Sequence, residues 1–528
     1  MHATNLTALI DARRHDAAPL LFDRARAVGA TALASEAAKL ARGLQSLGVR
    51  AGDRVAIWMP NVPAWLALFF ACARLGAIAV SVNTRFRSHE VADIVGRSGA
   101  KVLAFWPAFK GLDFAGILSQ CEASALERIE SIVVYSEAGD QAPPPMLHGK
   151  RVARYEALLD LAPHQGETAA GDTGCVIFTT SGTTKAPKFV LHDQRTVIGH
   201  GADVARGFAL DASSVMFLAP PLCGVFGFCC AMAALVAGRP LVMRPVWDAA
   251  LAARDIVAFG VTHLNASDDA VQQLLEQSRE EIPYPSVHFI GYAAFNPALG
   301  DLVERAGARG LKLVGLYGTS EIQALFARQP EHAPASERVQ GGGLPVSREA
   351  RVRVRDPDSG RVLAHGEAGE LEFFAPGSRM VEYFGNPEAT AAAFTADGWY
   401  RSGDLGYTLA DGRFVYLTRM GDSMRLGGFL VSPAEIEEVV QQVPGIDGCQ
   451  VVGATHEGQP RAIAFVTLEP GAKLDEAAAL AHVGAQLARY KVPARMFALD
   501  AFPVTTGSNG TKIQKGRLRE MAAERLSP

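Results

Sequence analysis

The sequence predicts an α/β protein with a large N-terminal domain of layered α/β subdomains, a small β-rich subdomain within it, and a small α+β C-terminal domain. The first half of the chain alternates apolar runs of helical spacing with apolar, β-branched runs, a pattern typical of helices packed on a mostly parallel sheet. A glycine-rich stretch at 421–428 then precedes a last segment with a helix of its own. At 528 residues the chain is too long for a single core.

The elements of the first half follow from the spacing of their apolar side chains. Residues 34–47 and 64–75 repeat apolar residues at the period of a helix, so we expect helices there. Residues 55–59 and 77–82 are short apolar runs, which predicts buried strands. The region 138–150 contains three consecutive prolines and is expected to be a loop or linker.

The second half is predicted to contain the β-rich subdomain and a domain boundary. Apolar and polar residues alternate in 351–374, with Asp-Pro and Gly turns between the runs, as in short half-buried strands. A helix is expected to begin at Pro433, because proline suits the first helical position and glutamates follow in the first turns. We therefore expect an N-terminal domain over 1–419 and a C-terminal domain over 420–528.

Charge and cysteine content exclude several classes of function. Lys and Arg number 51 against 55 Asp and Glu, for a net charge of -4, and we find no basic stripe studded with aromatic residues. We therefore expect no nucleic-acid partner. The seven cysteines form no CxxC pair, and we expect buried, reduced thiols in a cytoplasmic protein. Residues 1–20 lack the apolar core of a signal peptide.

One uncharged segment, residues 214–238, is long enough to suggest a transmembrane helix. Two consecutive prolines at 220–221 break the run, and two glycines follow closely. We therefore expect a buried strand, a loop and a helix over about 227–236. No membrane span is predicted.

A polar loop after a predicted buried strand is the strongest local signal. Residues 175–178 form an apolar run, and the stretch 179–188 reads Thr-Thr-Ser-Gly-Thr-Thr-Lys-Ala-Pro-Lys. Such a loop offers backbone N–H groups, hydroxyls and an ammonium, which suit the oxygens and the charge of a triphosphate. The spacing differs from that of the common P-loop. Taken alone, the stretch fits an ordinary polar surface loop equally well.

Four further stretches follow this loop in order. They are Leu-Tyr-Gly-Thr-Ser-Glu at 316–321, Asp-Gly-Trp-Tyr-Arg-Ser-Gly-Asp at 397–404, Thr-Arg-Met-Gly-Asp at 418–422 and Lys-Ile-Gln-Lys-Gly-Arg-Leu-Arg at 512–519. Singly, each could be a turn, a core aromatic or a solvated lysine. In this order and at these separations they resemble the adenylate-forming (AMP-binding) superfamily of acyl-CoA synthetases, peptide-synthetase adenylation domains and luciferases. The resemblance runs from about residue 34 to residue 519.

The resemblance implies a ligase reaction in two halves. A carboxylate attacks the α-phosphate of ATP, assisted by Mg²⁺, and the thiol of coenzyme A then displaces AMP. We expect an acyl-CoA ligase for an apolar fatty or aromatic acid, with a homodimer as one option for its assembly. The alternative is a free-standing adenylation enzyme that loads a carrier-protein phosphopantetheine. A catalytically idle nucleotide- or acyl-binding protein is disfavoured, because Lys512, Glu321 and Asp404 are retained.

The resemblance also assigns roles to residues. Glu321 matches the family's Mg²⁺-binding glutamate, and Ser320, where the family usually has Thr, would donate to the α-phosphate. Tyr317 would stack on adenine, and Asp404 would accept from the ribose hydroxyls with help from Arg419. The other residues expected to bind the nucleotide are Thr180, Ser181, Gly182, Thr183, Thr184, Lys188, Ala293, Gly318 and Thr319.

The C-terminal domain would supply a mobile lysine. Lys512 matches the family's invariant lysine, which would bridge the carboxylate and the α-phosphate. Lys515 is a rival, because the preceding loop looks one or two residues longer than usual. The resemblance implies a hinge at Gly421, where glycine suits a large backbone rotation. That rotation would bring Gly427 and Gly428 toward the CoA pantetheine.

The acyl pocket is the least determined part. The resemblance places it at Cys223, Gly224, Val225, Phe226, Tyr292 and Gly315. Cys223 and Gly224 stand where the family has a bulky aromatic residue and a histidine, which should leave more room. No carboxylate occurs in 221–228 to pair with a substrate ammonium, so an amino acid is disfavoured. A neutral apolar acid fits better.

Overall fold

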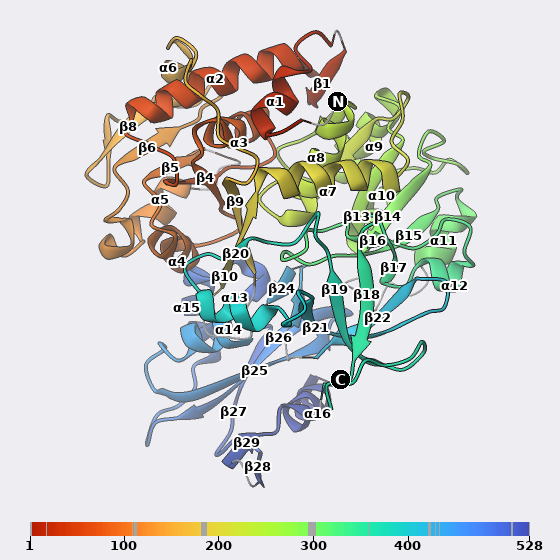
Figure 1. Cartoon of the computed structure of the whole chain (residues 1–528). Coiled ribbons are helices and arrows are strands. Elements are labelled where there is room, and N and C mark those ends of the chain that lie inside the picture. Colours follow the sequence, from red (N-terminus) through yellow and green to blue (C-terminus); the bar gives the residue numbers. More distant parts are fainter. Residues whose placement is uncertain are drawn as a thin grey trace.

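The computed structural model describes residues 3–16, 18–107, 109, 113–180, 187–293, 302–357, 359–420, 424–427, 429–431, 433–507 and 510–526. Figure 1 shows a large N-terminal part, coloured red to green, with the blue C-terminal part lying below it. Within the described residues, two large sheets form the N-terminal part and a three-stranded sheet forms the centre of the C-terminal part. The predicted α/β class with one large and one small domain is confirmed.

The first large sheet is built from the apolar runs of the first half and is mostly parallel. β3 pairs in parallel with β4 and β5, and β6 pairs in parallel with β5 and β8. Its central strands are buried, as expected for a sheet covered on both faces. In spatial order the described strands are β20 (Glu382–Tyr383), β10 (Lys188–Asp193), β9 (Gly174–Thr180), β4 (Ile78–Ser81), β3 (Arg54–Trp58), β5 (Val102–Phe105), β6 (Ser131–Val134), β8 (Lys150–Arg154) and β7 (Met146–Leu147).

The second large sheet joins a parallel half to the predicted β-rich part. Val352 pairs with Phe373 and Val354 with Leu371, which confirms the alternating strands expected in 351–374. In spatial order the described strands are β18 (Arg351–Arg355), β19 (Gly369–Phe374), β21 (Tyr400–Thr408), β22 (Phe414–Arg419), β17 (Gly342–Pro345), β16 (Ala327–Arg328), β15 (Leu313–Tyr317), β14 (Phe289–Ala293), β13 (His263–Ser267), β11 (Met216–Leu218), β12 (Leu241–Met243), β1 (Pro19–Asp23) and β2 (Arg26–Gly29).

Helices pack against both sheets, and some of them begin and end at residues typical of helix ends. α3 begins with Pro63 in its first turn and ends at Gly76, whose φ of +70° is a left-handed helix cap. The described helices of the N-terminal part are α1 (Leu6–Asp11), α2 (Ala30–Ser46), α3 (Pro63–Leu75), α4 (Ser88–Ser98), α5 (Phe114–Ser119), α6 (Tyr155–Leu159), α7 (Gln194–Gly207), α8 (Val225–Ala237), α9 (Ala249–Ala258), α10 (Asp268–Glu276), α11 (Leu302–Ala308), α12 (Ala335–Arg338) and α13 (Pro387–Ala393), with a 3-10 turn, η2 (Ala123–Leu126).

The C-terminal part has a core of its own. Two helices, α14 and α15, pack on the β25–β26–β27 sheet around Ile436, Val451 and Val483. Its described elements are β23 (Met424–Leu426), β24 (Phe429–Val431), α14 (Pro433–Val440), β25 (Ile446–His456), β26 (Gln459–Leu468), α15 (Glu476–Gln486), η4 (Arg489–Lys491), β27 (Arg495–Ala498), β28 (Val504–Gly507), β29 (Gly510–Ile513) and α16 (Lys515–Leu526).

Most predicted elements are confirmed, and one is wrong. The helices and strands expected in the first half correspond to α2, α3, β3 and β4, and the uncharged segment 214–238 divides into β11, a loop and α8. The expected linker 138–150 contains β7 and the start of β8, because His148 and Gly149 both adopt positive φ and turn the chain back. No helix in the described ranges is long and apolar enough to cross a bilayer.

The predicted domain boundary lies between two observed strands. β22 ends at Arg419 and β23 begins at Met424. The predicted hinge, Gly421, lies outside the described residues, as does Gly428. The division into 1–419 and 420–528 therefore stays a prediction.

Candidate active site

The turn that follows β15 places several predicted site residues together. β15 ends at Tyr317, and the chain continues through Gly318, Thr319 and Ser320 to Glu321. Glu321 is buried, and its Oε1 accepts a hydrogen bond of 2.7 Å from the Tyr383 hydroxyl. The Thr319 hydroxyl is buried and has no hydrogen-bond partner among the described residues. A buried donor without a partner is unusual, and it suits an anion that the site is built to receive.

The same turn has a strained backbone, and two buried histidines donate hydrogen bonds to its carbonyl oxygens. Gln323 and Leu325 have φ of +62° and +64°, a region that side chains other than glycine rarely adopt. His192 on β10 and His200 on α7 lie 2.7 Å from the carbonyl oxygens of Ser320 and Ala324. Burial lowers the pKa of both histidines to about 4. Since a carbonyl only accepts, each neutral ring donates its Nε2–H to the turn.

The predicted adenosine residues meet where the end of β15 lies beside the middle of β21 and the end of β22. The Tyr317 hydroxyl donates to Asp404 Oδ2 at 2.6 Å, and both residues are buried. The Tyr317 ring packs against Phe373 and Phe414. Asp404 pairs across the sheet with Arg419. Three residues assigned to adenine and ribose, each from a different motif, therefore come to one place.

The predicted phosphate loop joins β9 to β10. Thr180 and Lys188 are paired residues at the ends of these antiparallel strands, so the loop between them starts and ends at one point. Its predicted residues Ser181, Gly182, Thr183 and Thr184 lie outside the described residues. The Lys188 ammonium lies 4.5 Å from the centroid of the Tyr383 ring, close enough for a cation–π contact.

The predicted acyl residues lie on neighbouring elements. Tyr292 on β14 is paired with Gly315 on β15, and burial raises the pKa of Tyr292 to about 12. A Cβ on Gly315 would lie 2.0 Å from the Gln340 carbonyl oxygen, so only glycine fits there. Ala293 ends β14 one residue later.

The remaining acyl residues stand at the start of α8. Gly224 is the residue before the helix, Val225 and Phe226 form its first turn, and Cys223 is buried just before it. Further along the helix, Cys229 Sγ lies 3.9 Å from Gln323 Oε1. α8 therefore connects the predicted acyl residues with the turn that carries Glu321.

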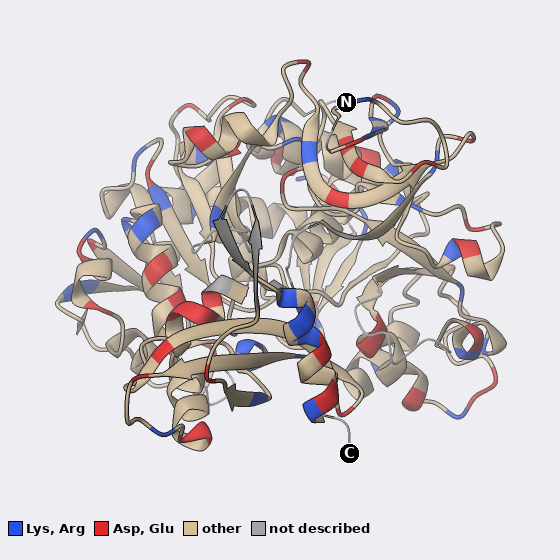
Figure 2. Cartoon of the chain, turned by 90° about the horizontal axis from the view of Figure 1, so that it is seen from below, with Lys and Arg blue, Asp and Glu red and all other residues tan. Residues whose placement is uncertain are grey.

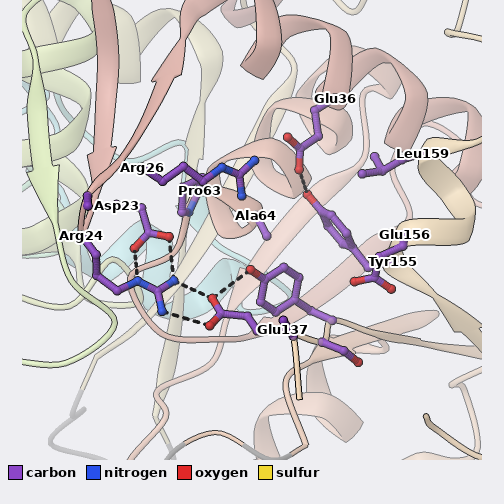
Figure 3. Close-up of a pocket in the computed structure, with 14 residues that line it drawn as sticks. Asp23, Arg24, Arg26, Glu36, Pro63, Ala64, Glu137, Tyr155, Glu156 and Leu159 are labelled. Atoms are coloured by element: carbon purple, nitrogen blue, oxygen red, sulfur yellow. Dashed lines mark hydrogen bonds and ion pairs between the residues drawn. The ribbon is translucent and has the colours of Figure 1, made fainter. Parts of the chain in front are cut away.

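A cavity of about 500 Å³ lies in a different part of the molecule. It is bordered by the β1–β2 hairpin, α2, the start of α3, the loop after β6, and α6. Figure 3 shows Arg24 between Asp23 and Glu137, and Tyr155 pointing at Glu36. These pairs tie the second large sheet to the loop after β6, and α2 to α6, so we interpret them as structural.

The surface seen from below mixes both signs of charge. Figure 2 shows Lys and Arg interspersed with Asp and Glu over most elements, including α16. Within the described ranges, no group of three or more His, Cys, Asp or Glu side chains could hold a metal ion.

Comparison with known proteins decides the family. The sequence matches the model of the AMP-binding enzyme over residues 10–384 and that of the AMP-binding enzyme C-terminal domain over 435–508. The chain belongs to the AMP-binding enzyme family. The resemblance given by the five motifs is confirmed.

Named relatives of this AMP-binding enzyme are CoA ligases. It is 30% identical to the 3-[(3aS,4S,7aS)-7a-methyl-1,5-dioxo-octahydro-1H-inden-4-yl]propanoyl:CoA ligase of Mycobacterium tuberculosis, over 91% of each chain. It is also 30% identical to the feruloyl-CoA synthase of an Amycolatopsis species, over 92% of each chain. The expected type, an adenylate-forming acyl-CoA ligase, is confirmed.

Solved structures of one synthetase from Bacillus subtilis share the fold. A double mutant of its o-succinylbenzoate CoA synthetase, bound with the product analogue OSB-NCoA, matches with a TM-score of 0.82 and 23% identity, covering 97% of this chain and 98% of that one. The same synthetase in complex with AMP matches with a TM-score of 0.67 and 22% identity, at the same coverage. The overall arrangement of this AMP-binding enzyme is thus closer to the first.

The predicted catalytic lysine is not brought to the other residues in this arrangement. Lys512 lies on β29, paired with Thr505 on β28. Figure 1 shows this hairpin at the far end of the C-terminal part, away from β15 and β9. Its rival Lys515 forms an ion pair of 3.2 Å with Glu437 inside the same domain.

A buried ion cluster joins the two parts of this AMP-binding enzyme. The Lys491 ammonium lies 2.7 Å from Glu90 on α4 and 2.7 Å from Glu435 on α14. Burial alone would lower the pKa of Lys491, but the two carboxylates outweigh it and raise the pKa. Nearby, the predicted CoA residue Gly427 has a φ of +56°, and a Cβ there would lie 2.9 Å from the Tyr490 Cβ.

Sequence reasoning missed several residues that shape the site. Tyr383, His192 and His200 belong to none of the five motifs, and a lone tyrosine or histidine in an apolar run carries no spacing signal. Asn265 was missed as well. Its side chain packs so closely against Gly291 on β14 that a Cβ there would lie 1.9 Å from the Asn265 Oδ1. The Lys491–Glu90 pair joins residues 401 positions apart, which a single sequence does not reveal.

Proposed function

We propose that this AMP-binding enzyme joins an apolar carboxylic acid to coenzyme A through an acyl-adenylate. The observation that carries the proposal is the turn after β15, where Glu321 and the Thr319 hydroxyl, which has no partner among the described residues, adjoin the Tyr317–Asp404 pair. A carboxylate, a free donor and an aromatic ring with a second carboxylate suit a metal, a phosphate and an adenosine respectively.

In the first half-reaction, a carboxylate oxygen of the acid would form a bond to the α-phosphorus of ATP. The bond from that phosphorus to the bridging oxygen breaks, and pyrophosphate leaves. Asp404 and Tyr317 would hold the adenosine, while Ser320 and Thr319 would donate to the phosphate. Lys188 and the loop 181–184 would hold the leaving phosphates. Orientation of this kind lowers the barrier because the reacting atoms already face each other.

The metal in this proposal is Mg²⁺, and the residues present fit it. Glu321 supplies one carboxylate, and protein Mg²⁺ sites at nucleotides commonly use one or two carboxylates with phosphate oxygens. Glu321 Oε1 is already bonded to Tyr383, and Oε2 has no hydrogen bond to any other described residue. The ion would neutralise charge on the phosphates.

The second half-reaction would use the arrangement described above. The CoA thiolate would attack the acyl carbonyl carbon, and AMP would leave from it. The higher TM-score with the CoA product-analogue complex than with the AMP complex, 0.82 against 0.67, supports this assignment. In the first half-reaction the C-terminal domain would rotate about Gly421 and bring Lys512 to the α-phosphate. In the second half-reaction the domain would rotate back and bring Gly427 and Gly428 toward the CoA pantetheine.

An apolar acid, aliphatic or aromatic, is proposed as substrate. The start of α8 carries no charged side chain, and Cys223 and Tyr292 are buried. An ammonium or a second carboxylate would be left unpaired there at considerable cost. The inden-yl propanoyl and feruloyl relatives are consistent with a ring-bearing acid. The seven cysteines are free, and we propose a cytoplasmic location on that basis.

Product assays test the proposal. Purified enzyme with ATP, Mg²⁺ and a panel of fatty and aromatic acids should release AMP, and thioester should form with free CoA. AMP release that depends on a holo-carrier protein instead of CoA would contradict the ligase and favour a carrier-loading enzyme. Size-exclusion chromatography of the same preparation tests the proposed homodimer.

A further inference from the structure

Tyr383 contacts two oppositely charged groups, the Glu321 carboxylate and the Lys188 ammonium. The proposed function requires that these two groups do not pair with each other. It lies on β20 and is 3% exposed, and its neighbour on β10 is Val190. Its hydroxyl donates to Glu321 Oε1 at 2.7 Å, and its ring lies 4.5 Å below the Lys188 ammonium. We propose that Tyr383 is a positioning residue, which orients the Glu321 carboxylate toward the metal and keeps Lys188 from pairing with it. This inference rests on the proposed function.

Two hydrogen bonds fix the position of Glu321. The hydroxyl of Tyr383 fixes Oε1, and the backbone N–H of Met380 donates to the Glu321 carbonyl oxygen at 2.6 Å. Both donors come from one short segment that runs into β20. Since Oε1 is occupied, Oε2 is the carboxylate atom left to face a ligand. A metal-binding carboxylate oriented in this way by a neighbouring hydrogen bond binds its ion more tightly.

The aromatic ring keeps the cation separate from the carboxylate. Among the described residues Lys188 forms no ion pair, and its contact is with the ring face. Without the ring, the ammonium and the Glu321 carboxylate could form a direct pair in a largely buried place. Each would then be neutralised before phosphate or metal arrives, because a paired buried charge is hard to separate. The cation–π contact holds Lys188 while leaving its N–H groups for phosphate.

The chain offers a matched control for the hydroxyl. Tyr155, 2% exposed, also donates its phenol to a glutamate, Glu36, but beside the cavity described above. Tyr383→Phe and Tyr155→Phe each remove one hydrogen bond from a buried phenol to a glutamate and keep the ring. A general loss of stability would affect both variants alike. Only the first should alter metal binding.

The test measures Mn²⁺ bound to the full-length enzyme in the presence of ATP, by electron paramagnetic resonance, with no turnover needed. We expect Tyr383→Phe to weaken Mn²⁺ affinity by roughly 10–100-fold, the usual effect of removing such a supporting bond. Tyr155→Phe should keep wild-type affinity. In a Glu321→Gln background, Tyr383→Phe should have no further effect. Wild-type affinity in folded Tyr383→Phe would overturn the inference, as would an equal loss in Tyr155→Phe.

Two further arms keep the result unambiguous. Tyr383→Met removes the ring and the hydroxyl while filling similar volume, and it should weaken Mn²⁺ binding at least as much as the phenylalanine variant. If Tyr383→Phe does not fold, wild-type affinity in Tyr383→Met overturns the inference instead. If wild-type enzyme binds no Mn²⁺ with ATP and forms no AMP, the proposed function itself is wrong. If instead the wild-type enzyme binds Mn²⁺ normally and the Tyr383 variants bind it equally well, only the inference about Tyr383 is wrong.

Discussion

Two polar clusters in the N-terminal part each contain a buried phenol that donates a hydrogen bond to a glutamate, and they differ in whether a polar group is left without a partner among the described residues. Beside the cavity, Tyr155 donates to Glu36, and Arg24 bonds both Asp23 and Glu137. Beside β15, Tyr383 donates to Glu321 while the Thr319 hydroxyl has no partner among the described residues.

The difference is the one expected between polar groups that hold the fold and polar groups that bind a ligand, the role proposed for the second cluster. In the first cluster, the charged groups pair with one another, and Arg24 and Glu137 are also partly exposed to solvent. In the second, the buried Thr319 hydroxyl has no partner in the described part of the chain, and the turn carries two residues at positive φ, Gln323 and Leu325. Strain and unpaired donors of this kind persist where binding uses them.

Lys491→Ala should have the largest effect, because it opens a closed cluster between the two domains. It would leave Glu90 and Glu435 buried without their shared cation, at a cost of roughly 3–5 kcal/mol. We expect a looser domain arrangement in small-angle X-ray scattering and slower thioester formation, with adenylation less affected. Lys491→Arg is the control. Unchanged scattering and an unchanged ratio of the two half-reactions would show that the cluster does not hold the domains.

Lys512→Ala should cost about 10²–10³-fold in ATP–pyrophosphate exchange, because the group would stabilise charge only as the adenylate forms. ATP binding should stay largely intact, since the adenosine residues lie in the other domain. Lys515→Ala, which breaks the Glu437 pair, serves as the comparison and should keep most exchange activity. Persistent exchange in Lys512→Ala together with loss in Lys515→Ala would mean that the lysines are assigned in the wrong order.

The neutral histidines below the turn predict a loss of stability in acid. Their pKa of about 4 lies below the ordinary 6.5, so the folded state binds fewer protons than the unfolded state between these values. Their contribution is present above about pH 6.5 and is lost as the pH falls toward 4, roughly 2 kcal/mol for each histidine at pH 5. Thermal unfolding should show a steep fall in Tm between pH 7 and 5. His200→Gln should flatten that slope, and an unchanged slope would contradict the account.

Tyr155→Phe should have the smallest effect. Losing one hydrogen bond to a carboxylate in a closed cluster should lower the free energy of unfolding by about 1–3 kcal/mol. At a temperature where the variant is folded, kcat and the KM for ATP should equal those of the wild type. Urea unfolding and steady-state assays provide both numbers. A selective rise in the KM for ATP would erase the distinction between the two clusters.

The sequence predicted the fold class, most elements and the motifs, because each rests on local spacing. It predicted Tyr317, Glu321 and Asp404 as one site through a family resemblance, and the structure brings them near one another. It could not predict the supports of that site. Tyr383 reaches Glu321 from 62 positions away, and His200 reaches Ala324 from 124 positions away, so both contacts depend on how the sheets pack.

The expectation of a loop or linker at 138–150 failed for a local reason. Prolines at 143–145 correctly indicated irregular chain, but the hairpin of β7 and β8 depends on the turn at His148 and Gly149. The position of Lys512 could not be predicted either, because it depends on how the C-terminal part packs against the N-terminal part. The resemblance selects this lysine, and only the structure shows it on the β28–β29 hairpin.

The most direct test is a crystal structure of the enzyme with ATP and Mg²⁺. The account predicts the base against Tyr317, the ribose hydroxyls on Asp404, and a phosphate oxygen within hydrogen-bond distance of the Thr319 hydroxyl. Nucleotide bound in the cavity beside Arg24 and Tyr155, with the Thr319 hydroxyl still unpaired, would contradict it.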